Sequence, residues 1–161
     1  MRSVTLFVSG LAVGLAVQVA VAQSGNKGVQ MMNHVGVTVP NVSEAVAYYT
    51  QKMGYKEAFR VTNDKGDPTL VYMQISKNTF LELNQGAPDR PTGFTHYGLV
   101  VDKAADAVKM FRDRGVKVTD VNVSAGTKAN LANITDPYMG RIELVEITPE
   151  SSHRKAIDSW K

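Results

Sequence analysis

The chain has 161 residues, of which 43% are hydrophobic and 20% are charged. This composition is typical of one globular domain and excludes a disordered, collagen-like or multi-span membrane protein. The net charge of +3 is too small to predict a nucleic-acid partner. There are no cysteines, which excludes disulfides, zinc ribbons, cysteine nucleophiles and iron–sulfur clusters. Any metal site must therefore use histidine and carboxylate ligands.

Residues 1–22 have the pattern of a secretory signal peptide. Arg2 precedes an apolar run over residues 4–17, and Ala20 and Ala22 place small side chains before a cleavage point at Gln23. A single membrane anchor is the alternative, since a spanning helix needs about 20 apolar residues. We expect cleavage, a periplasmic or secreted protein, and no stable membrane insertion of the mature chain. The polar residues 23–30 predict a flexible tether.

The rest of the chain contains an internal repeat. Residues 33–39 and 95–101 each alternate in side-chain character as a strand does, with His34 and His96 at equivalent places. Apolar residues at helical spacing follow each run and end near Gly54 and Gly115, which suit the end of a helix. Each half therefore starts with a strand and a helix.

Three strand-like segments follow each helix. They are residues 56–61, 69–75 and 79–83 in the first half and residues 117–123, 129–134 and 141–147 in the second. The sequence thus predicts an α+β domain of two tandem β-α-β-β-β modules, residues 31–84 and 93–148. Residues 149–161 are predicted to form a C-terminal helix that begins at a Thr-Pro pair. His153, in this polar tail, is predicted to lie at the surface.

Four polar side chains within the apolar strands are candidate metal ligands. His34 and His96 lie in the first strands of the two halves, and Glu82 and Glu143 lie in the last strands. A strand histidine can be purely structural, and a buried glutamate can pair with a neighbour such as Arg141. However, a carboxylate buried without a partner costs free energy, so two repeat-related His and Glu pairs indicate a shared cation. Imidazole and carboxylate together suit a divalent ion such as Zn, Ni, Co, Mn or Fe.

These features resemble the vicinal oxygen chelate superfamily, also called the glyoxalase/bleomycin resistance/dioxygenase group. The resemblance covers residues 31–148 and is carried by residues 33–36, 79–83, 95–98 and 136–144. It implies an open, cup-like mixed sheet around a metal, with the helices on its outer face. It also implies that the ligands are those of glyoxalase I-type members, here His34, Glu82, His96 and Glu143. One departure is the turn Asp-Pro-Tyr-Met-Gly, where the superfamily usually has Asp-Pro-Asp-Gly.

The resemblance implies an isomerase or lyase that acts on a small-molecule substrate by moving a proton next to a metal-chelated carbonyl or vicinal diol. Glu143 is the first candidate for the base, with Glu82 as its acid–base partner. Two alternatives stay open. An extradiol dioxygenase-like Fe(II) enzyme would use His34, His96 and Glu143, and a non-catalytic binding or resistance protein would use the cup without a metal. Because glutathione chemistry is cytosolic and we expect export, lactoylglutathione is not assigned as the substrate.

Aromatic and basic side chains supply candidate substrate-binding residues, namely Phe80, Tyr97, Tyr138 and Arg141, with Tyr72, Met139 and Arg60 as further candidates. The arginines would meet an anionic group. One chain has room for a complete site, but a homodimer that exchanges modules would build the same site at its interface. We expect a homodimer.

Overall fold

The structure, a computed structural model, describes residues 25–89 and 91–161. The predicted signal peptide, residues 1–22, lies outside the described residues, as do the first two residues of the predicted tether. Within the described part, no helix combines the length and apolar character that crossing a membrane requires.

The elements follow the predicted repeat. The first module contains β1 (Val29–Val39), α2 (Val42–Met53), β2 (Lys56–Thr62), β3 (Pro68–Ser76) and β4 (Thr79–Gln85). The second contains β5 (Gly93–Val101), α3 (Ala104–Asp113), β6 (Asn122–Val123), β7 (Asn130–Asp136) and β8 (Gly140–Glu146), and α4 (Ser152–Asp158) follows. Two β-α-β-β-β modules in an α+β fold are therefore confirmed.

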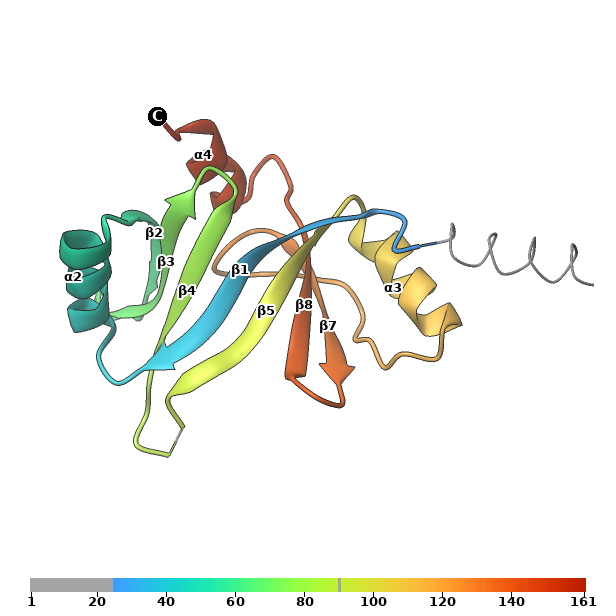
Figure 1. Cartoon of the computed structure of the whole chain (residues 1–161), viewed down its shortest axis with the longest axis horizontal. Helices are drawn as coiled ribbons and strands as arrows, with labels where there is room; N and C mark the ends of the chain where they lie inside the picture. The colour runs from blue at the N-terminus through green and yellow to red at the C-terminus, as the bar shows by residue number, and fades with distance from the viewer. Residues whose placement is uncertain (1–24, 90) are drawn as a thin grey trace, which may run out of the picture.

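All eight strands form one open mixed sheet in the order β2-β3-β4-β1-β5-β8-β7-β6 (Figure 1). At its centre β1 is antiparallel to β5, while β1 is parallel to β4 and β5 is parallel to β8. The modules are thus joined edge to edge through their first strands, which places the two histidine-bearing strands side by side.

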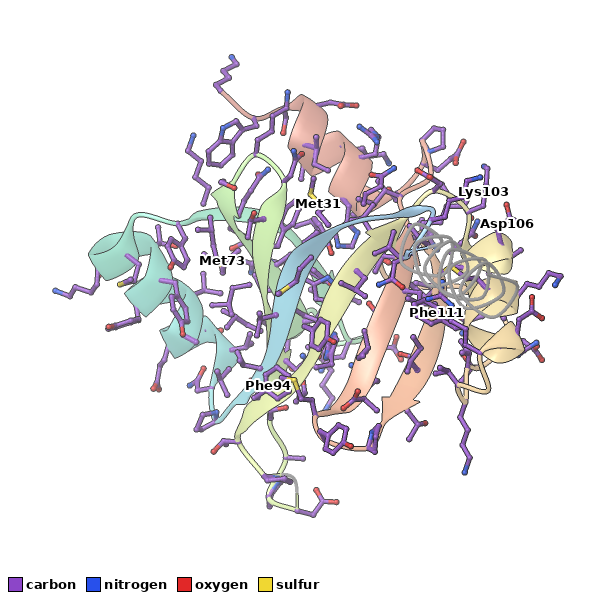
Figure 2. All side chains as sticks on the ribbon, turned by 45° about the vertical axis from the view of Figure 1, so that its right-hand side comes forward. Met31, Met73, Phe94, Lys103, Asp106 and Phe111 are labelled. Atoms are coloured by element: carbon purple, nitrogen blue, oxygen red, sulfur yellow. The ribbon has the colours of Figure 1, made fainter. Side chains whose placement is uncertain are left out.

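Two helices cover the outer face of the sheet, at opposite flanks of the molecule (Figure 1). Asn41 starts α2, because its side chain accepts from the backbone N–H groups of Ser43 and Glu44, and Gly54 ends it in the left-handed conformation. The apolar side of α2 packs on β3 and β4 around Met73, and that of α3 packs on β7 and β8 with Phe111 (Figure 2). The helices of both modules therefore lie where the resemblance implies.

The C-terminal helix α4 lies on the inner face instead. Its Ala156 and Ile157 pack against Tyr72 and Phe80, whose side chains alternate along β3 and β4 with those that face α2. A loop over residues 124–128 also reaches this side. There Ser152 N donates to Thr127 O at 2.8 Å. We call the space between the inner face, this loop and α4 the cup.

Some boundaries differ from the prediction. Residues 29 and 30 belong to β1 rather than to a flexible tether, because Val29 pairs with Val101 and Asp102 N donates to Gly28 O. The predicted strand over residues 117–123 reduces to β6 and one isolated bridge from Val118. The C-terminal helix starts after Ser151, whose hydroxyl accepts from Arg154 N.

Candidate metal centre

The two histidine side chains project into the cup from the neighbouring antiparallel strands β1 and β5. Each imidazole ring lies over a glycine of the other strand. The register pairs His34 with Gly98 and Gly36 with His96. A Cβ atom on Gly98 would overlap the His34 ring, and one on Gly36 would overlap the His96 ring. The segments 34–36 and 96–98 therefore each supply one imidazole and the glycine against which the other imidazole packs. The two Nε2 atoms lie 3.1 Å apart.

The residue before each histidine orients its ring. Asn33 Oδ1 lies 2.9 Å from Nδ1 of His34, and Thr95 Oγ1 lies 2.9 Å from Nδ1 of His96. Both oxygens can accept a hydrogen bond from Nδ1–H, which leaves the Nε2 lone pair for a metal. Burial lowers the pKa of His34 to about 3, so this imidazole is neutral, as a ligand must be, at neutral pH.

The glutamates complete the cluster from the strands that flank β1 and β5. Glu82 Oε2 lies 3.6 Å from His34 Nε2 and 3.4 Å from His96 Nε2, and Glu143 Oε2 lies 3.6 Å from His34 Nε2. One ligand atom from each residue lies within 4.8 Å of the other three, and all four residues are buried. Zinc binds N and O ligands at about 2.0–2.2 Å, so ligand atoms around one ion stand about 3 to 4 Å apart. These side chains fit a single divalent ion.

Glu82 is firmly held. Tyr72 Oη donates to its Oε2 atom, and Asn84 Nδ2 donates to Oε1 at 2.8 Å. Burial acts to raise the pKa of Glu82, but the hydrogen bonds from His96 and Tyr72 stabilise the carboxylate, and the net effect lowers this pKa to about 2. Glu82 is therefore an ionised carboxylate with a fixed orientation.

Glu143 is held differently. Among the described residues, no hydrogen bond to its carboxylate is formed. Burial, together with the negative charge of Glu82, raises the pKa of Glu143 to about 7. This carboxyl group can therefore take up and release a proton near neutral pH, which Glu82 cannot.

The predicted substrate-binding residues are divided between four environments. Phe80 lies in the cup but is buried beneath α4. Tyr97 packs on the outer face with the α3 cluster, which corrects its assignment to the cup. Tyr138 is 92% exposed in the β7–β8 turn. Arg141 is exposed at the rim, with Nη2 2.6 Å from His96 Nδ1, so it is the one of the four that joins the centre to solvent.

The further candidates are divided in the same way. Tyr72 holds Glu82 within the cup. Met139 is 52% exposed in the same turn as Tyr138. Arg60 is paired with Glu57 on β2, outside the ligand cluster.

The prediction for His153 is wrong. Its side chain is 1% exposed and reaches into the cup from α4, where its ring lies against that of His34. The spacing of His153, Ala156 and Ile157 at i, i+3 and i+4 indicates one helix face, and this was the signal that the sequence offered.

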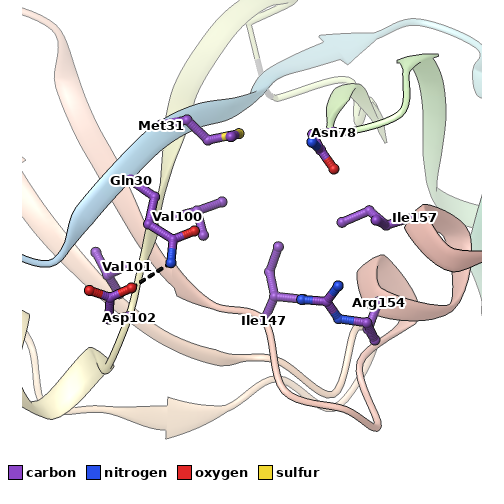
Figure 3. Close-up of a pocket in the computed structure, with 9 residues that line it drawn as sticks. All are labelled: Gln30, Met31, Asn78, Val100, Val101, Asp102, Ile147, Arg154 and Ile157. Carbon is purple, nitrogen blue, oxygen red and sulfur yellow. Dashed lines mark hydrogen bonds between the residues drawn. The ribbon is translucent and has the colours of Figure 1, made fainter.

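A pocket of about 190 Å³ lies beside α4 at one end of the cup (Figure 3). Met31, Val100, Ile147 and Ile157 form its apolar wall, and Arg154 lies at its edge. None of the four candidate ligands lines it. The pocket is therefore distinct from the candidate metal centre.

With this geometry established, the chain can be compared with known proteins. Residues 33–133 match the family model described as the Glyoxalase/Bleomycin resistance protein/Dioxygenase superfamily. The chain belongs to this superfamily. No curated protein matches its sequence.

Several solved structures share the fold. The chain is similar to methylmalonyl-CoA epimerase from Mycobacterium tuberculosis, with a TM-score of 0.66, 19% identity, and coverage of 76% of this chain and 91% of that one. It is similar to a variant of Streptomyces coelicolor methylmalonyl-CoA epimerase in complex with 2-nitronate-propionyl-CoA, with a TM-score of 0.65, 16% identity, and coverage of 76% and 98%. A hypothetical protein from Bacillus halodurans gives a TM-score of 0.62, 15% identity, and coverage of 75% and 96%.

The candidate metal centre is assembled within one chain. Its four candidate ligands come from both modules of the same polypeptide, so no exchange of modules is needed to bring them together. Two imidazoles and two carboxylates suit several divalent metals.

Proposed function

We propose that this protein is a metal-dependent isomerase that moves a proton at a carbon next to the carbonyl group of a small carboxylic acid derivative. The observation that carries the proposal is the unequal pair of carboxylates at one centre. Glu82 is hydrogen-bonded and ionised, whereas Glu143 is unanchored and has a pKa of about 7. Two carboxyl groups whose environments separate their pKa values are typical of acid–base chemistry.

In this proposal the side chains have distinct roles. His34, His96 and Glu82 hold the metal, and Glu143 accepts the proton from the substrate carbon and returns it. A bound divalent ion would supply Lewis-acid stabilisation of the charge that develops on the carbonyl oxygen. The acid–base role predicted for Glu82 becomes that of a fixed ligand, because both of its oxygens already accept hydrogen bonds.

Arg141 supports an anionic substrate. When Nε2 of His96 binds a metal, Nδ1 carries the proton. Thr95 can accept a hydrogen bond from this N–H group, but a guanidinium group only donates hydrogen bonds. Arg141 is then available at the exposed rim for a carboxylate of the substrate. Carboxylic acids are also consistent with the methylmalonyl-CoA epimerases that share the fold.

The cluster of all four side chains favours this function over the dioxygenase alternative. Glu82 lies within 3.6 Å of a nitrogen of both histidines. The dioxygenase alternative would use only His34, His96 and Glu143 as ligands and would give Glu82 no role. It also favours an enzyme over a metal-free binding protein, for which two buried carboxylates beside two imidazoles would have no use.

The test is hydrogen–deuterium exchange. The purified chain, loaded with Zn or Co, is incubated in D2O with methylmalonyl-CoA and with a panel of small α-substituted acids, and deuterium at the α-carbon is measured by mass spectrometry. We expect incorporation with one of these acids, none with Glu143→Gln, and less with Arg141→Ala. Absence of exchange together with catechol cleavage by the Fe-loaded chain would support the dioxygenase instead. Ligand capture without metal would support the binding protein.

Export and dimerisation are part of the proposal. Cleavage before Gln23 would deliver the mature domain to the periplasm or the medium, and N-terminal sequencing of protein recovered there tests it. A homodimer would need no shared site, since each chain contains all four ligands. Sedimentation velocity measures the oligomeric state.

A further inference from the structure

The C-terminal helix α4 places one imidazole against the metal centre. The ring of His153 is nearly parallel to that of His34, with centroids 6.3 Å apart. It also packs edge-on against Tyr72 at 4.7 Å, Phe59 at 5.1 Å and Phe80 at 5.5 Å. His153 is thus enclosed by three aromatic rings and one candidate ligand.

Packing alone does not account for a histidine at this place. Neither ring nitrogen of His153 has a hydrogen-bond partner among the described residues, and both nitrogens are buried. Burying a polar group without a partner costs free energy. A phenylalanine would fill the same aromatic surroundings without that cost.

The polar groups around His153 are already engaged. Tyr72 Oη donates to Glu82, and His34 uses Nδ1 with Asn33 and turns Nε2 towards His96. His153 is also outside the group of described residues whose ligand atoms lie within 4.8 Å of one another. It is therefore not a fifth ligand, and its partner is to be sought in a molecule that enters the cup.

We propose that His153 is a substrate-binding residue, which forms a hydrogen bond to an oxygen of the substrate next to the oxygens held by the metal. This inference rests on the proposed function. A neutral imidazole both donates and accepts, so it suits a hydroxyl, enol or carboxylate oxygen.

Because both nitrogens are buried, α4 has to yield slightly for the substrate to reach His153. The pocket beside α4 is lined by Arg154 and Ile157 of the helix and by Met31 and Val100 of β1 and β5, so it leaves space between the helix and these strands into which the helix can move (Figure 3). The helix has only seven residues.

The experiment uses the chain loaded with Co(II) and oxalate as the probe. Oxalate offers two adjacent oxygens to a metal and two more to the protein, and its binding is followed by the Co(II) absorption spectrum. We expect His153→Phe to raise the Tm, to leave the Co(II) affinity unchanged, and to weaken oxalate binding about fivefold to tenfold. His153→Gln, which keeps a donor and an acceptor, should restore part of the oxalate affinity.

Ile157→Val is the matched control. It removes one methyl group from the cluster that anchors α4 and keeps the imidazole, so we expect a lower Tm with unchanged oxalate affinity. Equal oxalate affinity in wild type and His153→Phe would overturn the assignment. So would an equal loss in Ile157→Val, or a loss of Co(II) affinity in His153→Phe. A wild-type chain that binds no Co(II) would overturn the proposed function as well, which distinguishes the two failures.

Discussion

Replacing Glu143 by glutamine should change how the stability of the chelator-treated protein depends on pH. Burial and the charge of Glu82 raise the pKa of Glu143 from 4.5 to about 7 in the folded chain. Between these two values the folded state binds more protons than the unfolded state, so this group lowers the free energy of unfolding as the pH rises. Glutamine does not titrate and removes this contribution.

The size of the effect follows from the pKa difference. A difference of about 2.5 pH units corresponds to about 3 kcal/mol well above pH 7, and to about 1 kcal/mol at about pH 5. Relative to wild type, Glu143→Gln should therefore gain about 2 to 3 kcal/mol between about pH 5 and about pH 8. Burial lowers the pKa of His34 and His153, which acts in the opposite direction, but both groups are present in both proteins and cancel.

Urea unfolding at the two pH values measures this quantity, with EDTA present throughout. Glu150→Gln, which changes an exposed glutamate, is the control and should show the same pH dependence as wild type. A constant stability difference between wild type and Glu143→Gln at both pH values would refute the reasoning. It would mean that the Glu143 carboxyl group is solvated or paired in solution. The difference in pKa between Glu143 and Glu82 would then be absent.

Three further substitutions test the construction of the centre. Gly98→Ala should greatly weaken Co(II) binding in calorimetry, because the added Cβ overlaps the His34 ring. An unchanged Co(II) affinity would contradict the packing of the His34 ring over Gly98. Asn33→Ala removes the group that orients His34 and should lower metal affinity about 10-fold to 100-fold, and a smaller loss in a chelator competition would argue against that role. Tyr72→Phe removes a donor to buried Glu82 and should destabilise the metal-free protein by about 1 to 3 kcal/mol in urea unfolding, whereas no change would show that water replaces the hydroxyl.

The four side chains of the candidate centre could be picked out from the sequence because they interrupt a local pattern of apolar residues. Glu82 and Glu143 are acidic residues within apolar strands, and the repeat pairs each of them with a histidine. The same alternation places Tyr97 and His96 on opposite faces, so the position of Tyr97 was also contained in the sequence. The aromatic ring of Tyr97 suggested a cup residue, but its position next to His96 in the strand places it on the opposite face of the sheet.

Other features depend on contacts that no local pattern encodes. The spacing of His153, Ala156 and Ile157 identifies a helix face, but not the surface against which it packs, because that surface is formed by β3 and β4 much earlier in the chain. The edge-to-edge pairing of β1 with β5 is similarly non-local. It decides whether one chain or two build the site, and the sequence left both possibilities open.

The crossed histidines have a consequence for how such a protein could arise. A solitary module would carry one imidazole and one glycine. Its imidazole would have no glycine to pack against until a second module lay beside it. Two copies related by a twofold axis would satisfy this need, and fusing them converts an association between molecules into one within a chain, at a high effective concentration. Fusion also releases the halves to diverge. In this protein the four candidate ligands occupy equivalent positions in the two modules, whereas Asn133 stands at the position equivalent to Tyr72 and Phe80 at the position equivalent to Arg141.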